Sequence, residues 1–381
     1  MSLVINALNP HYWPPTESPF WWLVFFSFGC IVGSFLNVCI YRMPLELSVV
    51  SPPSHCPHCK YSIPFYLNIP LVTWLVLKGR CKNCGAPISV RYFIVELFTG
   101  LTFLACWLVF GAQSPWLALV YCLFLSGLIV ATFIDFEHFI IPDEITLGGA
   151  VVGFVISFLL PSLHGVRTNG ESLVQSIIGI VAGAGIVYGV LRGGKLLFGR
   201  KKMKLPLEAT IIFSETALSL PDKEIPYEDI FYRKSDTIVF HARTVELVDR
   251  CYLNATVRLS PDRLQIDEEE IDPTSVPHME AVCAEIVLPQ EAMGLGDVKF
   301  MAAIGAFLGW EAVVFTLVVS SLIGAIYGGI MIALHRQEWS GRLYFGPFLA
   351  LAATIWLFTG PALVTWYLRF SDHMLTHMTG H

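Results

Sequence analysis

The sequence predicts an all-α polytopic membrane protein with about eight transmembrane helices, a cytoplasmic loop built around four cysteines and a cytoplasmic β-rich inserted domain. Of its 381 residues, 55% are hydrophobic and only 14% are charged, whereas soluble domains average about 25% charged residues. Residues 205–290 contain 17 acidic and 7 basic residues, a net charge of −10, which leaves +4 of the total of −6 on the remainder. This composition excludes a soluble or disordered chain and separates a membrane part from an acidic part.

Seven apolar stretches are long enough to cross a hydrocarbon core of about 30 Å, which takes about 20 helical residues. They are Phe20–Tyr41, Tyr92–Phe110, Pro115–Ile134, Ile145–Pro161, Leu173–Phe198, Ala312–Leu334 and Tyr344–Leu368. The stretch Val298–Trp310 is apolar but short, so it forms either an eighth crossing or half of a re-entrant hairpin with the stretch that follows.

The Lys and Arg residues indicate the orientation of these spans, because short cytoplasmic loops retain positive charge. With eight crossings, 22 of the 24 basic residues fall on one side, including those of the loop His335–Arg342, and only Arg167 and Arg369 fall on the other. The first side is predicted to be the cytoplasm. The first 20 residues contain no Lys or Arg, so we expect the first span to be retained rather than cleaved as a signal peptide.

The predicted spans divide the chain into five segments. These are a first span (1–41), a cysteine-containing loop (42–91), a membrane core (92–204), the acidic insert (205–290) and a second part of the membrane core (291–381).

Strand-like runs predict that the insert is mostly β-structure. They include Ala209–Phe213, Thr237–Phe240 and Ala255–Leu259, which are rich in β-branched and aromatic residues. The acidic run Asp267–Glu270 is interpreted as a solvated loop or, alternatively, as a patch that binds another protein.

Two CxxC pairs in the first loop predict a metal site. They consist of Cys56, Cys59, Cys81 and Cys84. Four thiolates on two tight turns provide the tetrahedral sulfur ligands that Zn²⁺ prefers, with no open position for catalysis, so such a zinc would be structural. Redox dithiols and unrelated free thiols are the alternatives. The neighbouring His55 and His58 are interpreted as bystanders.

Two aspartates at the ends of predicted spans are candidate catalytic residues. Asp135 ends the third span, and Asp297 begins the short stretch that follows Gly294 and Gly296. Ionisable groups beside hydrocarbon are costly and usually functional. The predicted topology puts both aspartates at the cytoplasmic edge of the membrane.

Two facing carboxylates in a partly desolvated site share a proton, so that one can activate water while the other donates to the scissile carbonyl. This is the chemistry of an aspartyl protease. The glycines lack the Cβ atoms that would keep an extended peptide away from Asp297. Asp143 is interpreted as a helix cap or as support for the pair, and Lys299 as a partner of the pair or of lipid phosphates.

Six motifs in order resemble those of the type IV prepilin peptidases, which are GxGD membrane aspartyl proteases. They are Gly33–Pro44, the two CxxC pairs, Ile88–Glu96, Ile134–Asp143, Gly294–Lys299 and Phe345–Ala350. The resemblance implies that Asp135 and Asp297 are the catalytic aspartates. Two departures are visible: Glu137 stands where relatives often carry a second aspartate, and compact members lack the insert.

The resemblance also implies a function. Such an enzyme removes the basic leader of type IV prepilins or type II secretion pseudopilins after a glycine, at the cytoplasmic face of the bacterial inner membrane. It often then methylates the new N-terminus with S-adenosylmethionine, although no sequence feature locates the methyl donor. Membrane lipid and a pilus or secretion assembly protein at the insert are further expected partners, and no nucleic acid is expected.

Four polar residues near the cysteine loop have two interpretations. Asn37, Arg42, Arg91 and Glu96 either satisfy one another and the backbone or contact the leader or methyl donor.

For the whole protein, a carboxylate-dependent proton or cation transporter and a zinc-stabilised membrane scaffold are the alternative functions.

Overall fold

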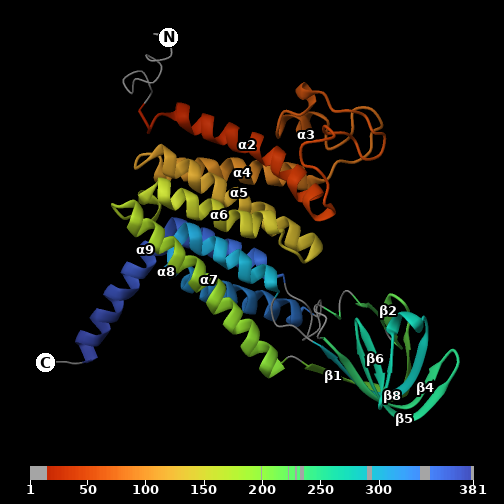
Figure 1. Ribbon diagram of the computed structural model, residues 1–381. Helices are drawn as coiled ribbons and strands as arrows, with labels where there is room; N and C mark the ends of the chain where they lie inside the picture. The colour runs from red at the N-terminus through yellow and green to blue at the C-terminus, as the bar shows by residue number, and fades with distance from the viewer. Residues whose placement is uncertain are drawn as a thin grey trace. The chain divides into compact units, whose positions relative to one another are not determined.

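The structure is a computed structural model (Figure 1). It describes residues 15–198, 200–221, 223–227, 230–231, 236–289, 294–334 and 344–378. The chain divides into two compact units, a helical one formed by Met1–Val187 and Leu295–His381 and a mainly β one formed by Tyr188–Gly294. The predicted loop His335–Arg342 lies outside the described residues.

Each predicted span corresponds to a helix. The long helices are α2 (Pro19–Arg42), α4 (Val90–Phe110), α5 (Pro115–His138), α6 (Asp143–Leu159), α7 (Asn169–Phe198), α8 (Leu295–Ala333) and α9 (Gly346–Met378). Five of them, α2, α4, α5, α7 and α8, are long and apolar enough to cross a membrane, whereas the apolar part of α9, Gly346–Gly360, is shorter. The predicted long apolar helices are therefore confirmed, and their insertion in a membrane, the eight crossings and their orientation stay predictions.

The short stretch Val298–Trp310 and the stretch after it belong to α8, which is interrupted at Gly309. A straight helix of 39 residues would be about 58 Å long, nearly twice the hydrocarbon thickness. Gly309 has φ 81° and ψ 177°, a conformation open to glycine because it lacks a Cβ atom. The chain can therefore change direction there.

The helices begin where the sequence supplies caps. Ser18 and Ser114 accept hydrogen bonds from the backbone N–H groups of Phe20 and Leu117, and a proline follows each serine at the first helical position. These residues satisfy N–H groups that have no partner within the helix. Helix α5 ends where Phe139 adopts a left-handed conformation, and Pro142 immediately precedes α6.

Neighbouring helices pack through glycines. In Figure 1, α2, α4, α5 and α6 run side by side, and α6 and α9 each contact α8. On α7, Gly179 and Gly183 approach the backbone of α8: a Cβ atom added to Gly179 would lie 2.0 Å from the carbonyl oxygen of Gly305, and one added to Gly183 would lie 2.2 Å from that of Met301. Small residues allow such close backbone approach in membrane helices.

The β unit contains one eight-stranded antiparallel sheet, which confirms the predicted β-rich insert. Its strands are β1 (Arg200–Phe213), β2 (Ala217–Leu220), β3 (Lys223–Pro226), β4 (Ile238–Leu247), β5 (Cys251–Ser260), β6 (Arg263–Ile266), β7 (Glu269–Ile271) and β8 (Met279–Pro289). The strand order is β3-β2-β1-β8-β4-β5-β6-β7. Alternate residues such as Phe240, Val257 and Ile286 are buried in its core, as the period of two predicts.

The first and last strands of the insert pair with each other. Strand β1 follows α7, strand β8 precedes α8, and their register runs from Arg200 opposite Pro289 to Phe213 opposite Met279. The chain therefore enters and leaves the sheet on neighbouring strands.

Three of the four acidic residues at the β6–β7 turn have partners within the insert. Asp267 accepts a hydrogen bond from the backbone N–H of Thr256, Glu269 pairs with Arg250, and Glu270 pairs with Arg263. Such exposed pairs contribute little free energy each, but they give these carboxylates partners inside the domain. A partner protein at this segment stays a prediction.

Candidate active site and metal centre

The four predicted ligands form a compact sulfur cluster. The Sγ atoms of Cys56, Cys59, Cys81 and Cys84 all lie within 4.8 Å of one another. The Cys56–Cys84 separation is 3.9 Å and the Cys59–Cys81 separation is 4.0 Å. This group could hold a metal ion, and neither His55 nor His58 belongs to it among the described residues.

Both CxxC turns have the same backbone arrangement. The N–H of Lys60 donates to the carbonyl of Cys56, and the N–H of Gly85 donates to that of Cys81. Lys60 and Gly85 both have positive φ values, 57° and 71°. Each turn thus brings two sulfurs to one side, as a tetrahedral site requires.

Local donors favour the thiolate form of two of the four cysteines, Cys59 and Cys81. The side-chain amide of Asn83 donates to Sγ of Cys59 at 3.5 Å. This hydrogen bond, followed by one from the backbone at Tyr61, lowers the pKa of the Cys59 thiol to about 6. Backbone hydrogen bonds lower the pKa of Cys81 as well. Thiolates are the form of cysteine that binds metal.

Buried polar residues fix the cysteine loop to the helical unit. Arg42 donates to the carbonyls of Ser48 and Pro52, at 2.9 and 2.7 Å. The N–H of Leu71, which precedes the short helix α3 (Val72–Val76), donates to Oε2 of Glu96 at 2.7 Å. Arg42 and Glu96 therefore anchor the loop through its backbone, whereas the structural interpretation predicted pairing of arginine with glutamate within this group.

Asn37 and Arg91 have different surroundings from these two anchors. The Asn37 amide donates to the carbonyls of Gly33 and Tyr92, but its buried Oδ1 has no hydrogen-bond partner among the described residues. Arg91 pairs with Glu137, so the expected pairing within this group of four is replaced by one that joins α4 to the end of α5. Glu137 lies two residues beyond Asp135 and thereby connects the two motif regions.

Asp135 is buried where the end of α5 meets the start of α9. Its side chain is 6% exposed, and its Oδ2 accepts a hydrogen bond of 3.0 Å from the N–H of Gly346, the first residue of α9. A helix N-terminus favours a carboxylate because its N–H groups are unsatisfied. A Cβ atom on residue 346 would lie 2.7 Å from Oδ2, so only glycine allows this approach.

Asp297 lies in the first turn of α8, next to Gly296. A Cβ atom built on Gly296 would lie 3.7 Å from Cβ of Ile141, and one built on Gly346 would lie 3.1 Å from Cδ1 of the same isoleucine. Ile141 therefore lies between the starts of α8 and α9. The helix ends that carry Asp135 and Asp297 meet around it.

Lys299 and Asp143 form an ion pair that ties the start of α8 to the start of α6. Nζ of Lys299 lies 2.7 and 2.9 Å from the two carboxylate oxygens of Asp143. The interpretation of Asp143 as the helix cap is wrong, because Pro142 occupies the N-cap position of α6 and Asp143 lies in the first turn. The two predicted support residues thus partner each other.

Two site residues were missed by sequence reasoning. Ile141 and Gly346 lie inside recognised motifs, but nothing in the sequence gave them a role. Their only signal was their position inside the motifs Ile134–Asp143 and Phe345–Ala350. Their contacts depend on how α5, α8 and α9 meet.

Comparisons with protein families match most of the helical unit. Residues 27–110 match the bacterial peptidase A24 N-terminal domain, and residues 122–205 and 279–329 match the type IV leader peptidase family. The cysteine cluster lies in the first match, and Asp135 and Asp297 lie in the second. Residues 206–278 of the insert are outside both matches.

Curated relatives have names that agree with these matches. The prepilin leader peptidase/N-methyltransferase of Aeromonas hydrophila is 28% identical over 379 residues, covering 91% of this chain and 94% of the relative. The enzyme of the same name from Myxococcus xanthus is 43% identical over 176 residues, covering 45% and 49%. The type 4 prepilin-like proteins leader peptide-processing enzyme of Escherichia coli is 35% identical over 204 residues, covering 43% and 75%. No solved structure matches the chain.

Proposed function

Since the chain belongs to the type IV leader peptidase family, we propose that it removes the leader peptide of type IV prepilins or related pseudopilins and then methylates the new N-terminus. We place it in the bacterial cytoplasmic membrane with its active site on the cytoplasmic side. The observation that carries the proposal is the meeting of α5, α8 and α9 around Ile141, which puts the ends bearing Asp135 and Asp297 at one place.

The two aspartates would act as a pair on water and the scissile peptide. One carboxylate, ionised, takes a proton from water, and the other, protonated, donates to the carbonyl oxygen. The Gly346 N–H orients Asp135, and the Lys299–Asp143 pair holds the start of α8 against α6. A Cβ atom at Gly296 would be in van der Waals contact with Ile141, and without that atom an extended substrate backbone would be able to come closer to Asp297.

We also propose that S-adenosylmethionine supplies the methyl group when bound. Among the described residues, the unpartnered Oδ1 of Asn37 fits an amino group, which both the donor and the new N-terminus carry. Asn37 would hold that group, and Glu96 lies one turn beyond Tyr92, whose carbonyl accepts a hydrogen bond from the Asn37 amide. These residues would orient the amine and exclude water.

Zinc is the metal that we propose for the cysteine cluster. Four sulfurs at about 2.3 Å from Zn²⁺ form a tetrahedron with edges of about 3.8 Å, and the separations of 3.9 and 4.0 Å in the structure agree with this edge. Four protein ligands leave no open position, so the ion would hold the loop rather than take part in catalysis.

Removal of one thiolate is expected to release the metal and unfold the loop. We expect the purified protein to contain one zinc per chain and Cys59→Ser to contain much less, because structural zinc binds with about 10 kcal/mol at neutral pH. Metal analysis and limited proteolysis of residues 42–91 would measure this. Cys251→Ser, an exposed thiol on β5, is the matched control. A metal-free wild-type protein with a protease-resistant loop would contradict the zinc proposal.

Co-expression with a type IV prepilin tests both activities together. We expect the prepilin to lose its leader and its new N-terminus to gain the mass of one methylene group, as measured by intact mass spectrometry. A prepilin expressed without the enzyme is the control. Leader loss without the mass increment would contradict the proposed methyltransferase activity. An uncleaved prepilin would contradict the proposed function as a whole.

A further inference from the structure

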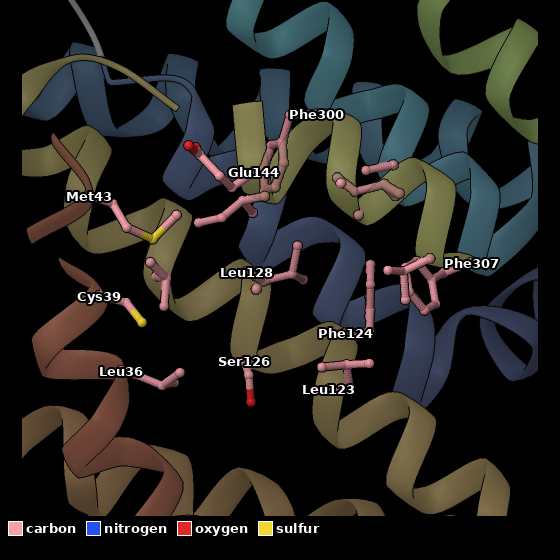
Figure 2. Close-up of a pocket in the computed structure, with 18 residues that line it drawn as sticks. Leu36, Cys39, Met43, Leu123, Phe124, Ser126, Leu128, Glu144, Phe300 and Phe307 are labelled. Carbon is pink, nitrogen blue, oxygen red and sulfur yellow. The ribbon is translucent and has the colours of Figure 1, made fainter. Parts of the chain in front are cut away.

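A groove lies between four helices, beside the candidate active site. Its volume is about 330 Å³, within the range of pockets that hold ligands, and it is lined by residues of α2 or the turn after it, α5, α6 and α8 (Figure 2). On α8 the lining residues are Phe300, Ala303, Ile304 and Phe307. Their spacing of three and four residues places them on one face of the helix, over a length of about 10 Å.

One end of the groove is at the catalytic level. Glu144, which follows Asp143, and Phe300, which follows Lys299, both line that end. Figure 2 shows Glu144 and Phe300 next to each other there, with Phe124 and Phe307 farther along. The groove therefore starts one residue beyond Asp143 on α6 and one residue beyond Lys299 on α8, and continues along these helices to Val152 and Phe307.

The groove favours hydrocarbon and is open along its margin. The hydroxyl of Ser126 donates to the carbonyl of Cys122 in its own helix, and the other described lining residues apart from Glu144 and Cys39 are apolar or glycine. At the margin, Leu123 is 53% and Val152 is 40% exposed. An apolar segment could therefore enter sideways from the bilayer.

Two glycines of the lining are not required by the packing. A Cβ atom at Gly127 would come no closer than 3.8 Å to another residue, and one at Gly148 no closer than 4.0 Å. Gly179 and Gly305 differ, since a Cβ atom there would overlap backbone atoms. The absence of side chains at 127 and 148 therefore keeps the groove open rather than allowing helices to meet.

We propose that this groove binds the hydrophobic membrane helix of the prepilin, at the part that follows the scissile bond. The inference rests on the proposed function and extends it from the aspartates to substrate recognition. Apolar contacts in the groove would fix how far the prepilin helix lies along the groove. The scissile bond, which precedes this helix, would then lie at the aspartates. The carboxylate of Glu144 at the catalytic end complements the positive charge of the leader.

Filling the groove tests this binding site. Gly127→Leu and Gly148→Leu add apolar side chains where a Cβ atom fits, and we expect each to slow processing of full-length prepilin by about tenfold or more, as a misfitted apolar pocket does. The matched control is Gly185→Leu on α7, an exposed glycine with nothing within 4 Å of an added Cβ atom. Gly127→Ala and Gly148→Ala add only the Cβ atom that fits, so we expect them to process prepilin faster than the leucine variants do. Equal protein yield and zinc content would show that the leucine variants are folded and that the groove is blocked.

Photo-crosslinking provides a second measurement that does not require turnover. A prepilin with benzoylphenylalanine in the first turns of its hydrophobic helix is bound to the Asp135→Asn variant, and we expect crosslinks to 123–130 or 300–307 that Gly148→Leu removes. Two results would overturn the proposal. One is wild-type processing in both leucine variants, as expected if the groove is filled by lipid, and the other is crosslinks confined to other helices.

The outcomes also distinguish the groove from the protease. If Gly148→Leu processes normally while Asp135→Asn does not, the groove proposal is wrong and the proposed function stands. If the wild-type protein leaves prepilin uncleaved, the proposed function is wrong, and if Asp135→Asn processes prepilin at the wild-type rate, only the catalytic role of Asp135 is wrong.

Discussion

Asp135→Asn and Asp297→Asn are each expected to lower the rate of leader cleavage by about 10³-fold or more. The amide has nearly the shape of the carboxyl group but can neither take a proton from water nor donate a carboxylic proton, and acid–base groups of this kind contribute about 10²–10⁴-fold each. Because the two groups act as a unit, we expect the double variant to be little slower than either single variant.

The measurement is single-turnover cleavage of a purified prepilin in detergent or liposomes. Glu171→Gln is a matched control, since Glu171 lies in the first turn of α7, as Asp297 does in α8, but outside the site. Equal zinc content and unfolding temperature would show that the aspartate variants are folded. Cleavage at a wild-type rate by either one would exclude the aspartate pair.

Of the glycine-to-alanine substitutions that we propose, Gly305→Ala is expected to destabilise the helical unit most. The added Cβ atom would lie 2.1 Å from the carbonyl oxygen of Gly179, far inside van der Waals contact, and both neighbours are helix backbone. Either α7 and α8 separate or the variant fails to fold, at a cost of about 3 kcal/mol or more in the free energy of unfolding.

Thermal unfolding and the yield of monodisperse protein would measure this effect. Gly185→Ala adds the same group to α7 where nothing lies within 4 Å, and it should raise stability slightly because alanine favours helix. An unfolding temperature for Gly305→Ala equal to that of Gly185→Ala would show that α7 and α8 do not meet as described.

Local patterns in the sequence predicted much of this fold. The apolar runs became helices, the strand-like runs of the insert became strands, and the spacing of Cys56, Cys59, Cys81 and Cys84 identified a group whose sulfurs cluster. In each case the information lies within a few residues, since hydrophobic period and turn chemistry are local properties.

Contacts between distant residues could not be predicted in the same way. Lys299 pairs with a residue 156 positions away and Arg91 with one 46 positions away, and several carboxylates were equally plausible partners for each. Gly309, Gly179 and Gly127 all lie in apolar stretches of the sequence. In the structure, Gly309 interrupts a helix, Gly179 allows close packing and Gly127 lines a groove. Only the arrangement of the helices distinguishes these roles.

The pairing of Arg200 with Pro289 has a consequence for how such chains diversify. Paired backbones in an antiparallel ladder are about 5 Å apart, so a hairpin of two or three residues could replace everything between these positions without pulling on α7 or α8. A gene could gain or lose this module in one event and leave the catalytic scaffold unchanged. The family model matches 122–205 and 279–329, so it covers both ends of this module and leaves out its middle, residues 206–278.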